Sequence, residues 1–393
     1  MSEFPADWEN GCIGDIAKVV SGYAFQGDDF HDNHQEGVPV VRMSDIQDQG
    51  LNLGSAKRIS NINQEVLRKF QIRQGDLLFG MSGSIEKSAI VNSNQQALLN
   101  QRVGALRSIK ENGNFHAHIF QSERVKSQIL DLAAGGAQLN ISAKQVESIR
   151  IAIPPLPEQK KIAEILSGID FLLKALNDLI AKQVSLKKAM TWDLMSHGAG
   201  SRDLKDSDQG KIPFDWEVRS LGSVFTLTSG KSKPKSLLSS IATGSEKIPV
   251  YGGNGITGYA SEYLLDLPTI TIGRVGEYCG AVHLTPNMCW VTDNALYIKD
   301  RISDFDLPFM YYFLVFCEIS KMRKKGGQPL ISQKPILDLV VALPPIEEQR
   351  RIALTLNSIS KNISIMEVRR QRIKEFRDSV SQDLLSGRKR VSI

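Results

Sequence analysis

The stretch Pro154-Pro-Leu-Pro-Glu-Gln-Lys-Lys-Ile-Ala163 decides how this chain is organised, because it recurs 190 residues later as Pro344-Pro-Ile-Glu-Glu-Gln-Arg-Arg-Ile-Ala353. The same offset relates Asp193-Leu-Met-Ser196 to Asp383-Leu-Leu-Ser386. Two matching segments at one spacing indicate an internal duplication and not a chance motif. The sequence therefore predicts two copies of one structural unit.

The front of each copy is repeated as well. Phe4-Pro-Ala-Asp-Trp8 resembles Ile212-Pro-Phe-Asp-Trp216, and Ser21-Gly22 resembles Ser229-Gly230. Here the offset is 208 residues, so the second copy is shorter in its interior. At 393 residues the chain is long enough for two domains of roughly 100–200 residues each.

A long helix is predicted after each Pro-Pro pair, over residues 154–197 and 344–387. Apolar residues recur there at steps of three and four, as in a helix that buries one seam against another helix. The first seam is Ile165, Ile169, Leu172, Leu176, Leu179, Leu186 and Met190, widened by Leu166, Leu173 and Ile180. The second is Ile352, Leu356, Ile359, Ile363, Met366, Ile373 and Val380. We expect an antiparallel, coiled-coil-like pair; the alternative is two core helices of one large domain.

The remainder of each copy mixes short strands, turns and one amphipathic helix. The strand-like runs are Val38–Arg42, Asp76–Phe79, Ser148–Ile153, Lys247–Tyr251, Thr269–Ile272 and Leu339–Leu343. The amphipathic helices are expected at Phe115–Leu132 and Phe305–Met322. The predicted fold is α+β, with two pseudo-twofold-related α/β domains at 1–153 and 211–343, a linker at 198–210 and a basic tail at 388–393.

Composition limits the class of protein. A formal net charge of +5 permits a nucleic-acid partner without requiring one. The four cysteines include no C-x-x-C pair, so reduced thiols are expected and neither a disulfide framework nor a zinc site is. The first residues carry no basic and apolar leader, and no apolar run reaches the ~20 residues of a membrane span. We expect a cytoplasmic protein without a bound metal.

Catalytic motifs are weak or missing. Gly253-Asn-Gly-Ile-Thr-Gly258 fits G-x-G-x-x-G, but a strand-like run follows it instead of a helix, which favours a turn-rich loop. Gly230-Lys-Ser232 resembles the end of a P-loop, yet Phe225 stands where that motif requires glycine. There is no H-E-x-x-H, P-D…(D/E)-x-K or N-P-P-(Y/F) motif, and we expect the close pair His116 and His118 at the surface. The sequence therefore predicts no catalytic residue.

Candidate DNA-binding residues fall into two groups. Local clusters of positive charge suit phosphate contacts and include Lys231, Lys233, Lys324 and Lys325. Side chains that suit base edges are Arg42, Ser44, Ser82, Ser84, Lys87 and Arg102 in the first copy, and Tyr251, Asn254, Arg274 and Asn294 in the second. Each cluster could equally be a solvated surface, and Arg274 could instead pair with Glu277 or Asp293.

Taken together, the repeated motifs resemble the specificity subunit of type I restriction–modification enzymes. The similarity rests on Pro-Pro-(Leu/Ile)-x-Glu-Gln before a long helix that ends Asp-Leu-(Met/Leu)-Ser, and on the opening Pro-x-x-Trp followed by Ser-Gly. It also rests on Tyr251-Gly-Gly-Asn-Gly-Ile-Thr-Gly-Tyr259, Ile270-Thr-Ile-Gly-Arg-Val-Gly276 and Val291-Thr-Asp-Asn-Ala-Leu296. The first copy departs from these motifs at Phe79–Lys87 and Leu99–Val103, which suits a domain that reads a different sequence.

The resemblance implies a non-catalytic subunit that binds double-stranded DNA. Two target-recognition domains would each read one half of an asymmetric bipartite site, and the helix pair would set the gap between the halves. The helices would bind two methyltransferase subunits, joined by restriction (translocase) subunits. S-adenosylmethionine, ATP and Mg would then belong to those partners. The alternatives are a DNA methyltransferase or nuclease with divergent motifs, and a coiled-coil scaffold without a DNA role.

Overall fold

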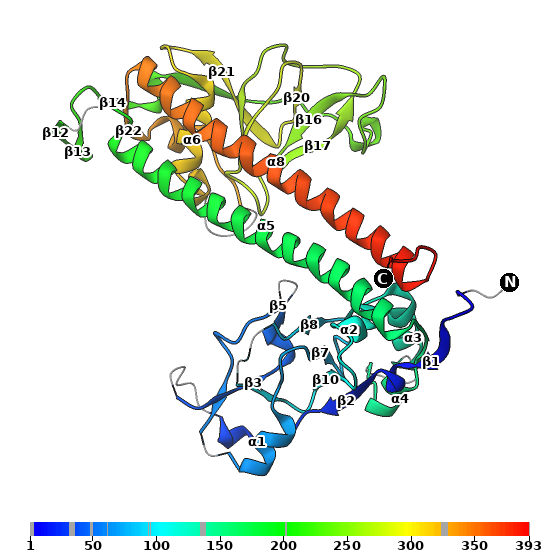
Figure 1. Ribbon diagram of the computed structural model, residues 1–393. Helices are drawn as coiled ribbons and strands as arrows, with labels where there is room; N and C mark the ends of the chain where they lie inside the picture. Colours follow the sequence, from blue (N-terminus) through cyan, green and yellow to red (C-terminus); the bar gives the residue numbers. More distant parts are fainter. Residues whose placement is uncertain are drawn as a thin grey trace. The chain divides into compact units, whose positions relative to one another are not determined.

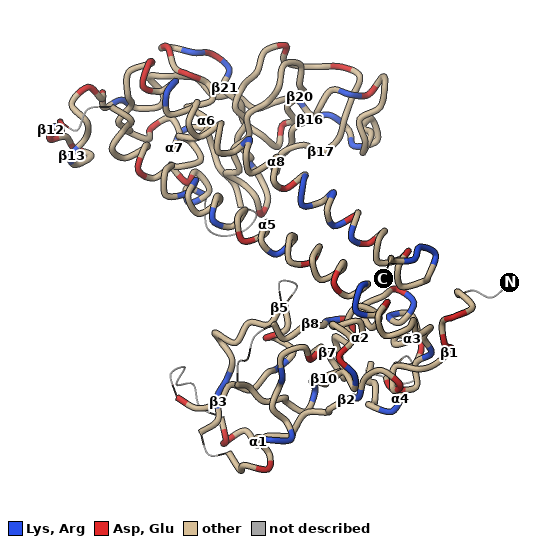
Figure 2. Tube along the Cα trace, in the orientation of Figure 1, with Lys and Arg blue, Asp and Glu red and all other residues tan. Residues whose placement is uncertain are grey.

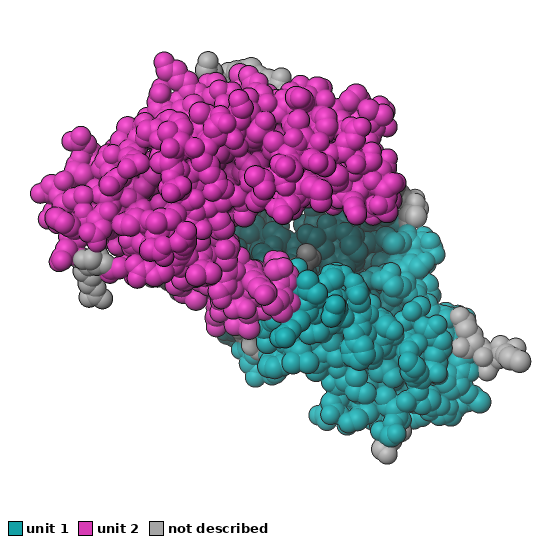
Figure 3. All heavy atoms as spheres, turned by 90° about the horizontal axis from the view of Figure 1, so that it is seen from above, with its two compact units in different colours: residues 1–178, 368–393 teal, residues 179–367 magenta. Residues whose placement is uncertain are grey.

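The computed structural model describes residues 4–30, 36–47, 50–60, 62–92, 94, 96–133, 139–200, 203–323 and 329–392. The chain divides into two compact units (Figures 1 and 3). Unit 1 comprises residues 1–178 and 368–393, and unit 2 comprises residues 179–367. Because both divisions fall inside long helices, each unit holds one domain and one end of each helix.

Unit 1 builds its domain from short strands and helices. They are β1 (Glu9–Cys12), β2 (Ala17–Ser21), β3 (Val38–Val41), β4 (Ile46–Gln47), β5 (Gly50–Leu51), β6 (Arg58–Ile59), α1 (Gln64–Phe70), β7 (Leu77–Gly80), β8 (Ser88–Ile90), β9 (Leu98–Leu99), β10 (Val103–Ser108), α2 (Phe115–Phe120), α3 (Glu123–Ala133), α4 (Ala143–Glu147) and β11 (Arg150–Ile153). The long helix α5 (Leu156–His197) follows and continues into unit 2.

Unit 2 opens with a hairpin of β12 (Leu204–Ser207) and β13 (Gly210–Pro213). Its domain contains β14 (Glu217–Ser220), β15 (Phe225–Ser229), β16 (Ile248–Gly252), β17 (Gly255–Ala260), β18 (Ile270–Gly273), β19 (Val282–Leu284), β20 (Trp290–Val291), β21 (Ala295–Arg301), α6 (Leu307–Phe316), α7 (Gln333–Leu337) and β22 (Val340–Leu343). The second long helix, α8 (Ile346–Leu385), returns to unit 1.

The two domains share one sheet topology. The larger sheet has the strand order β2-β10-β7-β8 in unit 1 and β15-β21-β18-β19 in unit 2. A smaller sheet has the order β6-β3-β9 in one and β17-β16-β20 in the other, with a parallel pair in each. The first strand of each domain pairs with the last, as β1–β11 and β14–β22. The duplication therefore extends through the middle of the first copy, where the sequence motifs diverge.

The amphipathic helices are shorter than predicted. The expected helix at Phe115–Leu132 is divided into α2 and α3, because Ser122 interrupts it: its Oγ donates to the carbonyl of Ile119 at 2.6 Å and accepts from the amide of Val125 at 3.4 Å. The expected helix at Phe305–Met322 ends as α6 before Glu318, whose φ of 48° is left-handed. A serine side chain that bonds nearby backbone groups competes with the helical hydrogen bonds, and a left-handed residue ends a helix.

Each unit packs the two long helices antiparallel against its domain. In unit 1, Leu166 near the start of α5 and Leu384 at the end of α8 share a core with Phe115 of α2. In unit 2, Met195 at the end of α5 and Ile352 near the start of α8 share a core with residues of α6. The predicted fold class, an α+β protein with two repeated domains and two long antiparallel helices, is confirmed.

The seam predicted for α5 is wrong at three exposed positions, with exposed fractions of 43–57%: Leu172, Leu179 and Leu186. The inner face instead passes through buried Ile180 and, seven residues on, half-buried Lys187. Lys187 is accommodated there because its ammonium lies 5.4 Å from the centre of the Tyr312 ring. A cation over an aromatic face is stabilised, so a polar residue occupies a place where sequence periodicity expects an apolar one.

The repeated sequence motifs meet at the start of each long helix. The indole Nε1 of Trp8 donates to Glu158 at 3.0 Å, and that of Trp216 donates to Glu348 at 3.2 Å. Both carboxylates are buried. The Pro-x-x-Trp and Pro-Pro-x-x-Glu-Gln motifs therefore form one polar contact, made twice, which holds the front of each domain against its helix.

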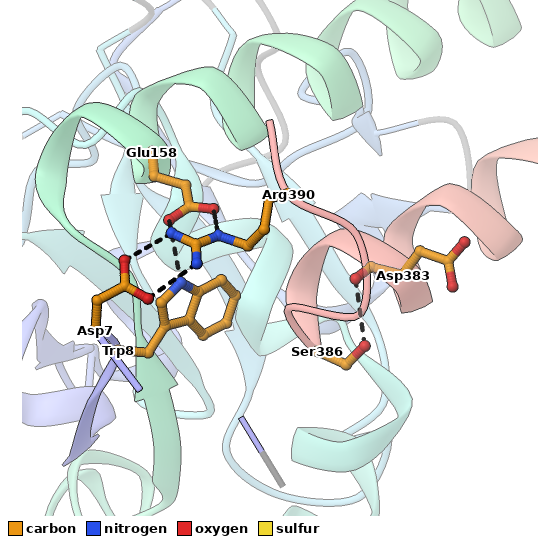
Figure 4. A network of polar contacts seen from close by, with 6 residues as sticks. All are labelled: Asp7, Trp8, Glu158, Asp383, Ser386 and Arg390. Carbon is orange, nitrogen blue, oxygen red and sulfur yellow. Dashed lines mark hydrogen bonds and ion pairs between the residues drawn. The ribbon is translucent and has the colours of Figure 1, made fainter. Parts of the chain in front are cut away.

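A second donor completes each of these contacts. In unit 1, Arg390 bonds Glu158 through Nε at 2.6 Å and also bonds Asp7 (Figure 4), which lowers the pKa of the Asp7 carboxyl. In unit 2 the backbone amide of Ala199 donates to Glu348 at 2.7 Å. Residues just after α8 and α5 thus donate to equivalent carboxylates in the two units: Arg390 to Glu158 through its side chain, and Ala199 to Glu348 through its backbone amide.

Buried polar residues join the helices to the domain in unit 1. His116 and His118, expected at the surface, are both buried in α2: His116 contacts Asn112 and the carbonyl of Gly75 within the domain, whereas His118 faces α5. His118 Nε2 lies 2.9 Å from Ser167 Oγ, and its Nδ1 lies 3.8 Å from Asp170. Asp170 accepts a hydrogen bond from Arg377 of α8 at 2.9 Å. One network therefore links α2, α5 and α8.

Unit 2 has a matching network with different chemistry. The Tyr312 hydroxyl donates to Asn357 at 2.9 Å and lies 3.0 Å from Ser360. Asn357 and Ser360 stand 190 residues after Ser167 and Asp170. Tyrosine thus replaces the ionisable histidine, and only unit 1 carries a titratable group with a near-neutral ordinary pKa at this position.

Unit 1 is therefore expected to lose stability as pH falls below about 6.5. Burial lowers the pKa of His118 to about 4, opposed by Asp170 and reinforced by Arg377 and His116. The unfolded chain takes up the proton first, so stability is complete above pH 6.5 and declines towards pH 4, by about 3 kcal/mol at 1.36 kcal/mol per unit. Urea unfolding between pH 7 and 4.5 measures this. His118→Gln should flatten the decline; an equally steep decline in that variant contradicts the assignment.

Two further findings concern the cysteines and the helices. All four cysteines are free thiols, and burial raises the pKa of Cys317 to about 12. Among the described residues, no helix combines the length and apolar character that crossing a membrane requires.

Candidate nucleic-acid interface

Several loops converge at one end of the larger sheet in unit 2. Strands β15 and β18 end there and β21 begins there, because both pair antiparallel with β21. Backbone bonds fasten the loops together: the amide of Arg274 donates to the carbonyl of Asn294 at 2.9 Å, and that of Lys231 donates to Val291 at 2.9 Å. We call residues 229–231, 251–254, 273–276 and 292–295 the loop edge of unit 2.

Unit 1 has the same edge. Strands β2 and β7 end where β10 begins, since both pair antiparallel with β10. The amide of Met81 donates to the carbonyl of Arg102 at 2.9 Å, and that of Tyr23 donates to Leu99 at 2.9 Å. Residues 21–23, 41–44, 80–84 and 100–103 form the loop edge of unit 1.

The repeated Ser-Gly motif is explained by how tightly these loops pack. A Cβ on Gly22 would lie 1.9 Å from the carbonyl oxygen of Asn100, and one on Gly230 would lie 2.1 Å from that of Val291. No side chain fits against a backbone carbonyl at such a distance. Glycine is therefore required at this point in both domains, and the edge is rigid.

Most predicted contact residues of unit 1 reach its loop edge. Ser44 and Arg102 are exposed on the edge, and Lys87 is exposed at the end of the β7–β8 loop. The other three are less accessible. Arg42 lies 3.9 Å from the buried carboxylate of Asp45, and Ser82 and Ser84 are half-buried. The structure thus brings five of the six together and sets Lys87 slightly apart.

Some of the predicted residues of unit 2 are exposed on the loop edge, and others are held in contacts within the domain. Lys231, Asn254 and Asn294 are exposed on the loop edge. Lys233 is only 9% exposed, because its ammonium lies 3.7 Å from the centre of the Trp290 ring and 3.3 Å from a carboxylate oxygen of Glu262. Tyr251 is only 6% exposed and packs in a small core, and this burial raises the pKa of its hydroxyl. Neither arrangement favours a DNA contact by Lys233 or Tyr251.

Arg274 lies at the centre of the unit 2 edge. Its guanidinium Nη1 donates to Ser229 Oγ at 3.0 Å, and its buried Nε has no hydrogen-bond partner in the part of the chain that the structure describes. The considered ion pairs with Glu277 or Asp293 are not among the contacts of these described residues. The side chain as a whole is half-buried and carries five N–H donors, so donors other than the covered Nε remain for an external acceptor.

A shallow hollow of about 600 Å³ adjoins this edge. Its lining comes from the β16–β17 hairpin and from the polar loops beside it, including Lys235, Asn254, Thr292 and Asn294. The hairpin contains Gly253–Gly258, so the G-x-G-x-x-G match forms a β-turn connection without a helix. Gly230-Lys-Ser232 likewise precedes a loop, which explains why neither segment has the geometry of a nucleotide loop.

Charged residues of both signs occur in both units. Figure 2 shows Lys and Arg on loops and along the long helices, with Asp and Glu between them. Lys324 and Lys325, predicted as phosphate contacts, lie outside the described residues. No cluster of His, Cys, Asp and Glu suited to a metal ion occurs among the residues searched, which are those described.

Sequence reasoning missed Tyr23. It follows the required glycine of the Ser-Gly motif, as Lys231 does in unit 2, and its ring is 40% exposed. The ring packs edge-on against Phe25 at 4.9 Å and tilted against Phe70 at 5.2 Å. The signal that could have found it was its place in the repeat, one residue after Ser21-Gly22.

Two domains of one topology, each presenting exposed polar side chains on equivalent loops, define a duplicated recognition protein. The model of the family "Type I restriction modification DNA specificity domain" matches residues 5–184 and 213–375. The chain belongs to this family, which confirms the resemblance seen in its motifs.

Relatives and solved structures agree with that assignment. A Methanocaldococcus jannaschii protein assigned as the MjaX specificity subunit of a type I restriction enzyme is 28% identical over 424 residues, covering 100% of this chain and 96% of the relative. The MjaVIII specificity subunit of the same organism is 25% identical, covering 98% and 94%. The crystal structure of a type I restriction–modification S subunit from M. genitalium has the same fold, with a TM-score of 0.69, 16% identity and coverage of 98% and 97%.

Proposed function

We propose that this chain is the subunit that gives a type I restriction–modification complex its DNA specificity, with one domain for each half of a bipartite, asymmetric duplex site. The supporting observation is that the two domains share topology and loop edge but differ in the side chains on that edge. Equivalent frames can meet duplex DNA in equivalent ways, and different side chains read different bases.

The chain acts in this proposal without catalysing a reaction. Its two glycine-rich matches to nucleotide motifs form a hairpin and a strand end, so S-adenosylmethionine, ATP and Mg would be bound by partner subunits. The competing function is a DNA methyltransferase or nuclease with divergent motifs. Equilibrium binding of S-adenosylmethionine to the purified chain distinguishes the two: saturable binding favours the enzyme.

Duplex DNA selection tests the recognition function itself. The full chain, assembled with methyltransferase subunits, is incubated with a randomised duplex library, and the retained sequences are read. We expect two short conserved blocks separated by a gap of fixed length. Retention of DNA without any conserved block, even at a salt concentration that suppresses phosphate-driven binding, would reject the proposal.

The long helices are proposed to bind two methyltransferase subunits. Large apolar side chains lie exposed on them in both units: Phe171, Leu172 and Phe376 in unit 1, and Leu179, Val184, Leu186 and Leu354 in unit 2. Exposed apolar groups on a paired helix are typical of a protein interface. We expect the mass of the saturated complex to correspond to two methyltransferase copies per chain; a single copy at saturation counts against the equivalence of the two units.

A further inference from the structure

Backbone hydrogen bonds identify the same positions on both loop edges. Tyr23 and Lys231 are equivalent, since each follows the required glycine and donates its amide to a matching carbonyl, that of Leu99 or Val291. We call this the first position. In both units the carbonyl that accepts this bond belongs to a short strand of the smaller sheet, β9 in unit 1 and β20 in unit 2.

The second position is held by Ser44 and Asn254. Val41 and Tyr251, the residues three places earlier, make matching backbone hydrogen bonds. The carbonyl of Val41 accepts from the amide of Asn100 at 3.1 Å, and the carbonyl of Tyr251 accepts from the amide of Thr292 at 2.9 Å. Both residues are exposed. Ser44 and Asn254 therefore each lie three residues after an equivalent backbone position, Ser44 in the 3-10 turn Met43–Asp45 and Asn254 in the β16–β17 turn.

The third and fourth positions lie at the ends of neighbouring strands and are joined by a backbone hydrogen bond. Met81 and Arg274 hold the third, since their amides donate to Arg102 and Asn294 and their carbonyls accept from Ile141 and Ile331. Arg102 and Asn294 hold the fourth. A single backbone frame thus presents Tyr, Ser, Met and Arg in unit 1, and Lys, Asn, Arg and Asn in unit 2.

The side chains at these positions differ in the bases they suit. Arginine pairs bidentately with the O6 and N7 of guanine, asparagine pairs with adenine, and apolar groups contact the methyl of thymine. At the third position Arg274 offers guanidinium donors, one of them buried without a partner among the described residues. Met81 offers a thioether that is half-buried against the domain core.

We propose that these four positions carry the half-site specificity of each domain, and that Tyr23 and Met81 are base-contacting residues of the first. The inference rests on the proposed function. It assigns a guanine in the second half-site to Arg274 and an A·T pair in the first to Met81. The Tyr23 side chain is 40% exposed, and its ring packs against Phe25 and Phe70.

The test compares variants in the duplex selection described above, using the full chain with methyltransferase subunits. Arg274→Lys keeps the charge and removes the planar fork, so preference for one guanine in the second half-site should fall about ten- to a hundredfold. Met81→Gln should change the preferred base at one position of the first half-site, and Met81→Leu, which stays apolar, should preserve it. Tyr23→Phe should weaken one base preference in the same half-site.

Matched controls separate base contact from structural damage. Arg219→Lys alters an exposed arginine paired with Glu217 on β14, which pairs with β22 in a separate two-stranded sheet, and Tyr263→Phe alters an exposed tyrosine that is not one of the loop-edge residues. Both should leave the two half-sites unchanged. Hydrogen exchange of amides in the altered unit reports whether that unit is folded in each variant.

The outcomes distinguish the two levels of the proposal. If the native chain selects a bipartite site but Arg274→Lys, Met81→Gln and Tyr23→Phe leave both halves as they were, the four-position assignment is overturned while the recognition function stands. If one of these variants weakens both half-sites equally in a folded protein, the assignment also fails. If the native chain selects no sequence at all, the proposed function fails.

Discussion

Replacing Glu348 by alanine is expected to lower the free energy of unfolding of unit 2 by about 3 kcal/mol, since a buried donor left without an acceptor costs about 1–3 kcal/mol and a second, partly exposed donor loses its acceptor as well. The buried donor is the indole Nε1 of Trp216, and the second is the backbone amide of Ala199, an exposed residue. Glu348 is 7% exposed, so water does not readily replace the lost oxygens. Hydrogen exchange of unit 2 amides measures the change without assuming that both units unfold together.

The neighbouring glutamate supplies a matched control. Glu347 is 75% exposed and pairs only with Arg350 on the helix surface, so Glu347→Ala should have little effect. Glu348→Gln retains an acceptor for Trp216 and should lie between the two. Equal exchange protection in Glu347→Ala and Glu348→Ala would mean that the Trp–Glu contact contributes nothing to stability. Glu158→Ala should destabilise unit 1 in the same manner.

The repeat made much of the fold predictable. Matching Pro-Pro-x-x-Glu-Gln segments placed the starts of α5 and α8, and Pro-x-x-Trp marked the front of each domain. Their contact was not predictable, because Trp8 and Glu158 lie 150 residues apart and nothing local requires them to meet. The inner face of α5 was misplaced for a related reason: Lys187 packs inward only because Tyr312 of another element receives it.

The loop edge was predicted unevenly. Ser44 and Asn254 were found by residue type, and each lies three residues after an equivalent hydrogen-bonded position of the loop edge. Met81 was missed because its residue type does not suggest DNA, and Tyr23 because its place in the repeat was not recognised. Only the hydrogen-bonded frame relates the two to Arg274 and Lys231. Lys233 was chosen by its charge and Tyr251 by its ring. In the structure Lys233 packs on Trp290, and Tyr251 is buried in a small core. Side-chain type suggests chemistry, whereas tertiary packing decides which groups remain available.

Deleting residues 171–177 from α5 together with 370–376 from α8 is expected to abolish selection of the native site and to shorten the gap between its halves. Both segments lie in unit 1 and flank the contact of Asp170 with Arg377, which the deletion leaves intact. Seven residues preserve the helical seam and remove about 10 Å at 1.5 Å per residue, close to three base pairs at about 3.4 Å.

Rotation limits how fully the gap can follow. Removing seven residues turns a helix by only about 20°, whereas three base pairs turn the duplex by about 100° when a turn takes about 10.5 base pairs. The shortened protein should therefore lose about a thousandfold or more of its affinity for the native site, towards non-specific binding. It should select a gap shorter by up to three base pairs, with both conserved blocks unchanged. The deleted segments include Phe171, Leu172 and Phe376, proposed above as partner contacts, so the chain is tested without methyltransferase subunits, by selection from a duplex library with variable gaps. An unchanged gap in a folded variant would refute the role of the helices in spacing.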